Sequence, residues 1–173
     1  MADENKISLD KYLKKKSPTL SMKIKIFTAI VDKIIQLKQA NIFHRDIKSA
    51  NVIINPNGEP SSISIIDFGV STSHSSEVYS GRVGTPPYFA PEQYLRDSYL
   101  AEPVTAFTLG VMLYTILFNK LPFYSREETC YHEPTWKGNL PAWIIDLNKD
   151  LLSKVPTCRP KLMEILGTLT FYS

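Results

Sequence analysis

Cysteine is scarce in this sequence, and glycine is absent before Gly58. Only Cys130 and Cys158 occur, and neither belongs to a cluster with the spacing of metal ligands. Two cysteines make a poor disulfide framework, so a reducing intracellular setting fits best. We therefore expect a cytoplasmic protein, with the nucleus left open. Because the first glycine is Gly58, no glycine-rich phosphate-binding loop lies upstream of it.

Strong net charge and long apolar runs are also missing. The net charge is +3, and the one notable basic run, Lys14–Lys16, is most simply the solvated end of a helix. No stretch approaches the ~18–20 consecutive apolar residues of a membrane span. The polar N-terminus, Met1–Lys6, is not followed by the apolar core of a signal peptide. These features argue against nucleic acid and against a membrane surface as partners.

The composition that is present is that of one soluble globular domain. Apolar residues make up 43% of the chain and charged residues 21%. A chain of 173 residues is long enough to bury a substantial hydrophobic core. We recognise no internal repeat, low-complexity tract or interdomain linker. We therefore expect residues 1–173 to form a single domain.

Apolar periodicity predicts a mostly helical chain. The segment 104–117 is apolar nearly all round but too short to span a bilayer, so it predicts a buried core helix. The other expected helices are a short capped one after Ser8, a long one from Ser21 to about Ala40, and two more at 142–153 and 160–169.

A small β-ribbon is expected near the middle of the chain. The apolar runs Val52–Ile54 and Ile63–Ile66 flank Asn55–Gly58, which has turn chemistry. This ribbon would deliver the chain to Asp67. Residues 70–89 are rich in Ser, Thr, Gly and Pro, the composition of a mobile loop. The fold class we expect is thus mostly α with a small β-ribbon, an α+β fold.

The segment His44-Arg45-Asp46-Ile47-Lys48-Ser49-Ala50-Asn51, with Asp67-Phe68-Gly69 after the ribbon, supplies the groups that phosphoryl transfer requires. Such a site needs a carboxylate near the acceptor hydroxyl, a cation on the γ-phosphate and oxygen ligands for Mg²⁺. Asp46 supplies the carboxylate, Lys48 the cation, and Asn51 and Asp67 the oxygen ligands. Each residue alone has an ordinary explanation as a surface pair or a turn cap, but their joint spacing is specific.

Together with Ala90-Pro91-Glu92, these motifs resemble the C-terminal lobe of a eukaryotic-type Ser/Thr protein kinase, from about residue 7 to the end. The resemblance implies that Asp46 and Lys48 are catalytic, that Lys48, Asn51 and Asp67 contact ATP, and that Asn51 and Asp67 bind Mg²⁺. Lys48 favours Ser/Thr over Tyr specificity, because Tyr kinases usually carry Ala-Ala-Arg or Arg-Ala-Ala at that point of the loop.

The same resemblance implies an activation segment that includes Asp67, Phe68, Gly69, Thr85 and Glu92. It assigns structural roles to His44, Arg45, Glu92 and Arg159, with Glu92 and Arg159 forming an ion pair. Arg45 is the residue that would pair with a phosphate on this segment. The candidate phosphorylation sites are Ser71, Thr72, Ser73, Ser75, Ser76, Tyr79 and Ser80, all of which are also explained as ordinary polar loop residues.

Two departures from the family pattern bear on activity. The segment before His44 holds no glycine-rich loop, no lysine-bearing strand and no partner-glutamate helix, so the resemblance implies a truncated kinase domain without an N-terminal lobe. Thr105 stands where the family usually has an Asp whose carboxylate accepts backbone hydrogen bonds from the catalytic loop. A hydroxyl replaces only part of that, because hydrogen bonds to a charged acceptor are roughly twice as strong.

Three interpretations stay open. The first is a non-catalytic regulator or mimic of kinase signalling, which binds a kinase, a kinase substrate or a scaffold. The second is a working Ser/Thr kinase that uses Mg²⁺ and ATP, with its upper lobe supplied by another chain or by a reduced architecture. The third is an inactive remnant. The missing lobe favours the first interpretation, and the intact set of Asp46, Lys48, Asn51, Asp67 and Gly69 favours the second.

Overall fold

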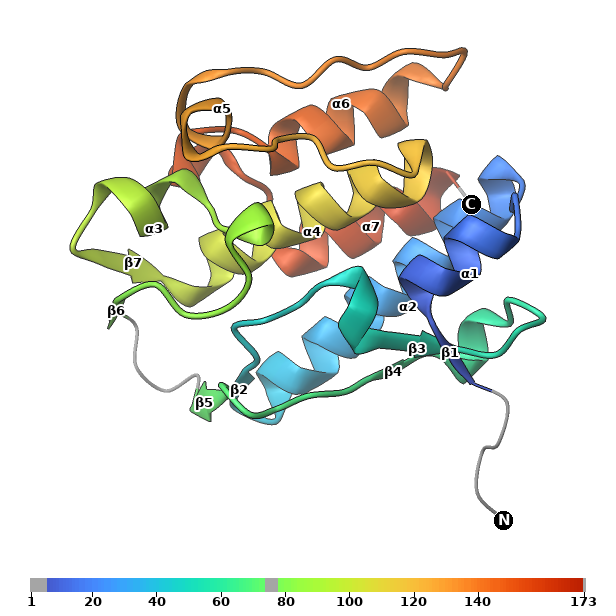
Figure 1. Ribbon diagram of the computed structural model, residues 1–173, viewed down its shortest axis with the longest axis horizontal. Helices are drawn as coiled ribbons and strands as arrows, with labels where there is room; N and C mark the ends of the chain where they lie inside the picture. The colour runs from blue at the N-terminus through green and yellow to red at the C-terminus, as the bar shows by residue number, and fades with distance from the viewer. Residues whose placement is uncertain (1–5, 74–77, 173) are drawn as a thin grey trace.

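Helices account for most of the chain in the computed structural model, which describes residues 6–73 and 78–172 (Figure 1). The helices are α1 (Leu9–Lys15), α2 (Leu20–Gln39), α3 (Pro91–Leu95), α4 (Ala101–Phe118), α5 (Arg126–Tyr131), α6 (Ala142–Leu151) and α7 (Leu162–Tyr172). The strands are β1 (Ile7–Ser8), β2 (Ile42–Phe43), β3 (Val52–Ile54), β4 (Ser64–Ile65), β5 (Thr72–Ser73), β6 (Val78–Ser80) and β7 (Ser98–Leu100). The expected mostly helical fold with a small ribbon is confirmed at this level.

The strands form short antiparallel pairings that hold the loops in place. The predicted ribbon pairs Val52 with Ile65, and β1 adds to its other edge by pairing Ile7 with Ile54. Gly58 closes the turn between β3 and β4 with a φ of 78°, a left-handed conformation that glycine adopts without strain. Two further pairings join β2 to β5 and β6 to β7. The ribbon therefore carries Asn51 and Asp67 at its ends, as the sequence predicts.

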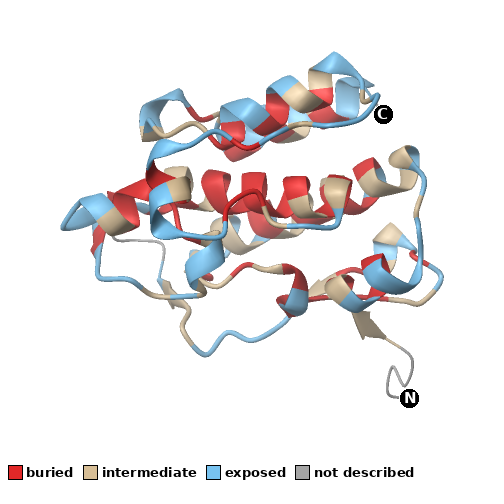
Figure 2. Ribbon diagram, turned by 45° about the horizontal axis from the view of Figure 1, so that its top comes forward, coloured by how far each residue is buried: buried red, intermediate tan, exposed pale blue. Residues whose placement is uncertain are grey.

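Helix α4 is the centre of the hydrophobic core, and Figure 2 shows buried residues along most of its length. The predicted core helix is confirmed, but it has 18 residues and extends beyond the expected segment 104–117 at both ends. By length and composition alone it could cross a membrane, yet 72% of it is buried inside the protein. Burial by the surrounding elements, rather than length, identifies it as a core helix. It packs against α2 on one side and α6 on another.

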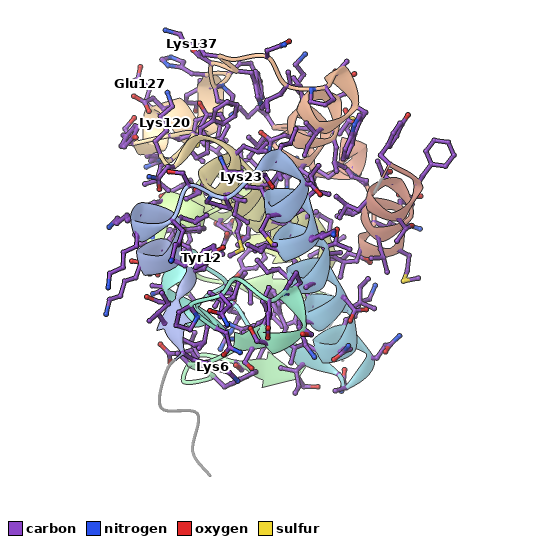
Figure 3. All side chains as sticks on the ribbon, turned by 90° about the vertical axis from the view of Figure 1, so that its right-hand side faces the viewer. Lys6, Tyr12, Lys23, Lys120, Glu127 and Lys137 are labelled. Carbon is purple, nitrogen blue, oxygen red and sulfur yellow. The ribbon has the colours of Figure 1, made fainter. Side chains whose placement is uncertain are left out.

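Helix α2 follows the predicted boundaries because its sequence supplies a cap and an apolar stripe. The hydroxyl of Thr19 accepts a hydrogen bond from the Met22 amide at 3.3 Å, which satisfies one unpaired donor at the helix start. Ile24, Phe27 and Val31 recur at helical spacing and are buried. Lys23, labelled in Figure 3, donates from α2 to the carbonyl of Leu117 near the end of α4 at 2.7 Å. The cap and the stripe thus fix α2 against the core helix.

Three parts of the chain differ from expectation. Residues 70–89, expected as a mobile loop, include strands β5 and β6 and a 3-10 turn at Pro86–Tyr88, while residues 74–77 lie outside the described part. Helices α3 and α5 were not predicted, because such short and mostly polar segments show no readable period. Ser8 precedes α1 as expected but makes no side-chain capping bond, and it belongs to strand β1.

Asn148 is a fully buried polar residue that joins α6 to α4. Its side-chain amide donates to the carbonyl of Gly110 at 2.8 Å and accepts from the indole N–H of Trp136 at 2.9 Å. The helices approach closely at this point, since a Cβ on Gly110 would lie 2.9 Å from the Cβ of Leu151. The buried amide therefore serves both as a contact between helices and as the acceptor for an indole that would otherwise be unpaired.

Asn148→Leu is expected to lower the free energy of unfolding by about 1–3 kcal/mol, because it leaves the Trp136 N–H without an acceptor. Urea denaturation followed by circular dichroism measures the change. The double variant Asn148→Leu/Trp136→Phe removes donor and acceptor together, so it should recover part of the loss. A double variant no more stable than the Asn148→Leu protein would show that lost packing, rather than the unpaired N–H, causes the effect.

Candidate active site

The segment 44–51 forms a loop between β2 and β3, and the buried side chain of His44 anchors it. The His44 side chain is 3% exposed, and its Nε2 lies 3.1 Å from the carbonyl oxygen of Ile66 at the end of the ribbon. Its ring also packs against that of Phe68, with 4.8 Å between the centroids. Burial lowers the pKa of His44, so the ring is neutral at physiological pH. His44 thereby ties the loop to the segment that carries Asp67.

Asp46 is the centre of a hydrogen-bonded network with Lys48, Thr85 and Asn51. Lys48 Nζ lies 2.7 Å from Asp46 Oδ2 and 2.8 Å from the Thr85 hydroxyl, which in turn donates to Asp46 Oδ1 at 2.5 Å. Asn51 Nδ2 donates to the Asp46 carbonyl at 2.9 Å and to Oδ2 at 3.3 Å. Burial alone would raise the pKa of Asp46, but the bonds from Lys48 and Thr85 outweigh it and the pKa is lowered. The Asp46 carboxylate is therefore ionised and oriented.

Asn51 directly precedes β3 and Asp67 follows β4, so the antiparallel pairing places both residues at the same end of the ribbon. The Ile66 amide donates to the Asn51 carbonyl at 3.0 Å, which brings the next residue, Asp67, close to Asn51. Asp67 adopts a φ of 66°, and its Oδ1 accepts from the Gly69 amide at 3.4 Å. Because Asn51 Nδ2 is engaged by Asp46, its side-chain carbonyl oxygen is the atom left for a ligand.

A resident metal site is not built from side chains alone here. No group of three or more His, Cys, Asp or Glu residues that could hold a metal ion occurs among residues 6–73 and 78–172. The oxygens of Asn51 and Asp67 fit Mg²⁺ only as part of a shell completed by water and phosphate, which is how Mg²⁺ is usually held beside nucleotides. The expected roles of Asn51, Asp67 and Lys48 toward Mg²⁺ and ATP remain predictions.

Glu92 and Arg159 form the predicted ion pair, and both are buried. Arg159 Nη1 and Nη2 donate to the two Glu92 oxygens at 2.6 and 2.8 Å. The guanidinium also donates to the carbonyls of Pro103 and Ser153 at 2.7 and 2.8 Å and lies 4.9 Å from the Phe107 ring centroid. The pair ties α3 to α4 and to the segment before α7.

Comparison with known proteins agrees with this geometry, since residues 2–171 match the family model for the protein kinase domain. The chain belongs to the protein kinase family. Serine/threonine-protein kinase PSK2 of Saccharomyces cerevisiae is 34% identical over 142 residues, which cover 81% of this chain and 13% of the yeast protein. Serine/threonine-protein kinase pim-2 of Danio rerio is 32% identical over 125 residues, covering 72% of this chain and 40% of that kinase.

A third relative, calcium/calmodulin-dependent protein kinase type 1 of Caenorhabditis briggsae, is 33% identical over 127 residues, or 70% of this chain and 35% of the worm protein. The chain thus spans well under two thirds of the length of each of these kinases. Ser/Thr kinases are similar to about four fifths of the chain, but the activity, substrates and partners of the whole proteins are not carried over by that similarity.

Thr105 does not take over the role of the aspartate that the kinase family usually has at this position. Its hydroxyl donates back to the Ala101 carbonyl of its own helix at 2.8 Å. A cavity of about 30 Å³ is lined by Thr105 together with His44 and Arg45 of the 44–51 loop. A water molecule needs roughly 10–15 Å³ of such volume, so the space beside Thr105 admits about two waters. Thr105 therefore supports the loop less than an aspartate would.

Tyr79 is one candidate phosphorylation site that the structure argues against. It is 9% exposed, its hydroxyl donates to the Ser73 carbonyl at 2.7 Å, and its ring contacts those of Phe43 and Tyr99. A phosphate cannot be added to this hydroxyl without opening the packing between β6 and β7. Arg45, the expected phosphate partner, donates from Nε to the Val70 carbonyl at 2.6 Å. Ser75 and Ser76 lie outside the described residues.

Proposed function

We propose that these residues form the C-terminal lobe of a Ser/Thr kinase site, the side that receives the protein substrate, and that the isolated chain regulates kinase signalling by binding. Its partner would be a kinase or a kinase substrate. The observation that carries this proposal is the Asp46–Lys48–Thr85–Asn51 network, which is complete within the chain. By contrast, the sequence before Gly58 contains no glycine-rich loop to cover a nucleotide.

The oriented carboxylate of Asp46 suits the binding of a substrate hydroxyl. Being ionised, it would accept a hydrogen bond from that hydroxyl and, with a phosphoryl donor bound, would take up its proton. Lys48 sits beside it as the cation that offsets phosphate charge. Asn51 and Asp67 would hold Mg²⁺, and Mg²⁺ with ATP would supply the phosphoryl group and its charge neutralisation. These four residues account for the acceptor half of the chemistry.

Two exposed apolar side chains close to this network support a binding role for the isolated chain. Ile66 and Phe68 are 42% and 44% exposed where the ribbon meets Asp67. In such an open half-site water reaches the charged groups and weakens each contact with a phosphate. Nucleotide would therefore be held poorly by these residues alone, while a protein partner could bury the apolar side chains.

An active Ser/Thr kinase is the second candidate, and the same network favours it. Asp46, Lys48, Asn51, Asp67 and Gly69 are all present, and a chain without catalytic duty could lose any of them with little harm to its fold. An upper lobe supplied by another segment or another chain would complete the nucleotide site. An inactive remnant is the third candidate, which would bind neither nucleotide nor a partner.

We expect the isolated chain to bind Mg-ATP with a dissociation constant no tighter than about 1 mM, equivalent to about −4 kcal/mol. Titration calorimetry with Mg-ATP measures this directly, and Asp67→Asn serves as the matched variant because it removes one proposed Mg²⁺ ligand. Micromolar affinity that Asp67→Asn abolishes would contradict the regulator and support the active kinase.

A further inference from the structure

A small pocket lies just beyond the Asp46 network along the chain. It has a volume of about 100 Å³ and is lined chiefly by Pro86, Pro87, Tyr94, Phe123, Tyr124 and Arg126. Its walls are aromatic and aliphatic, and Tyr124 is 70% exposed beside it. Arg126 is the one cationic side chain in its lining. The pocket thus combines apolar walls with a single positive charge.

The Arg126 guanidinium has no carboxylate partner among the residues that the structure describes. It lies 5.7 Å from the centroid of the Tyr94 ring and donates to the Tyr94 carbonyl at 3.5 Å. The carboxylate of the nearby Glu128 is engaged by the Tyr124 amide at 2.7 Å. Glu127 is exposed at the protein surface (Figure 3). Unlike Arg159, which is paired with Glu92, Arg126 therefore forms no ion pair with a carboxylate of the described residues.

Arg82 adds a second positive charge to the same region. It is exposed and follows β6, two residues before Gly84, whose backbone passes close to the Arg45 carbonyl. Burial raises the pKa of the Tyr94 hydroxyl, and the charges of Arg82 and Arg126 offset part of that rise, so both cations act on this hydroxyl. Two cations, Arg126 and Arg82, therefore act on the Tyr94 hydroxyl, and Tyr94 belongs to the lining of the pocket.

The pocket is within reach of a residue next to the bound acceptor. Thr85 is bonded to Asp46, and the Tyr94 hydroxyl donates to the carbonyl of the following residue, Pro86, at 3.1 Å. An extended peptide advances about 3.3–3.6 Å per residue. Because Pro86 and Arg126 line the same pocket, a side chain one to three residues from a Ser or Thr held at Asp46 would be within reach of it.

We propose that this pocket selects an acidic residue, Asp or Glu, within three positions of the acceptor Ser or Thr in the bound protein. The proposal rests on the proposed function, since it takes the Asp46 surface as the place where a substrate-like segment binds. Arg126 binds the carboxylate, Arg82 adds a second positive charge, and Pro86, Phe123 and Tyr124 supply apolar contacts beside the pair. Charge complementarity of this kind selects partners as well as strengthening binding.

The test uses fluorescein-labelled peptides with one Ser in an uncharged background and fluorescence polarisation with the intact chain. Each peptide carries one test residue at one of the three positions on either side of the Ser. The test residue is Asp, Lys, Leu or Asn, and Asn is the uncharged isostere of Asp. We expect Asp at one or two neighbouring positions to bind about tenfold more tightly than Asn, a gain typical of a charge-assisted bond. The gain should shrink as salt is raised.

Arg126→Gln is expected to remove this preference, so that the Asp and Asn peptides bind equally, and Arg82→Gln should reduce it. The matched control is Lys25→Gln, which removes an exposed cation of α2 and should leave the ratio unchanged. Thermal melting of each variant verifies its fold.

Three results would overturn the acidic pocket. If Ser peptides bind but Asp gives no gain, or if Leu or Lys is preferred, the pocket has another occupant. If the gain survives Arg126→Gln, another cation is responsible. If no Ser peptide binds whatever its composition, both the pocket and the proposed binding function fail, whereas binding without a gain from Asp overturns the pocket alone.

Discussion

Arg159→Ala is expected to lower the free energy of unfolding by about 3–5 kcal/mol, because it strands the Glu92 carboxylate in the interior without a partner. The two side chains are 7% and 4% exposed, so water cannot replace the lost bonds. The substitution also frees the carbonyls of Pro103 and Ser153, which the same guanidinium satisfies. For a domain of this size we expect the melting temperature to fall by roughly 6–20 °C.

Differential scanning calorimetry of the variant and the wild-type protein measures this change. The matched control is Arg96→Ala, because Arg96 is an exposed arginine one residue after α3, and a surface substitution there should stay within about 0.5 kcal/mol. Glu92→Leu/Arg159→Met removes both charges at once and should be less destabilised than Arg159→Ala. An unchanged melting temperature for Arg159→Ala would mean that the pair is solvated in solution.

Long periodic segments made most of the fold predictable from the sequence. Helix α2 was placed within a residue or two, because seven of its apolar side chains lie on one buried face. Helix α4 was found by its apolar composition, but its first turn, which contains Glu102 and Pro103, gave no such signal. Helices α3 and α5 and the β6–β7 pairing depend on contacts between distant segments, which a local pattern does not contain.

In the candidate site, too, the residues close together in sequence were predictable and the contacts between distant segments were not. Asp46, Lys48 and Asn51 lie within one short loop, so their spacing reveals them. The pairing of Glu92 with Arg159 came from the resemblance to kinases, since 67 residues separate them and no local rule joins them. The hydrogen bond from Thr85 to Asp46 and the free charge of Arg126 became visible only in the folded chain.

The isolated chain is expected to show no phosphotransfer that depends on Asp46. Positioning of the reactants can account for ~7–11 kcal/mol of a catalysed barrier, and these residues position only the acceptor side. Lys48, Asn51 and Asp67 can touch the metal and the γ-phosphate, but nothing in the sequence before Gly58 forms a glycine-rich cover for the other phosphates. If half of this positioning energy were lost, phosphoryl transfer would slow by roughly 10²–10⁴-fold, because each ~1.36 kcal/mol of barrier changes the rate tenfold.

A labelled-ATP assay on wild type and Asp46→Asn decides between the regulator and the active kinase. Capture of a kinase or its substrate from lysate by wild type and by Asp46→Asn alike would support the regulator, because surface binding does not need the proton acceptor. Asn at position 46 keeps the size of the side chain but loses the negative charge that Lys48 and Thr85 stabilise. Transfer by wild type that Asp46→Asn abolishes would overturn the regulator. Transfer that appears only when a glycine-rich upper lobe is added, and that again requires Asp46, would show that this chain holds the acceptor half of a divided kinase.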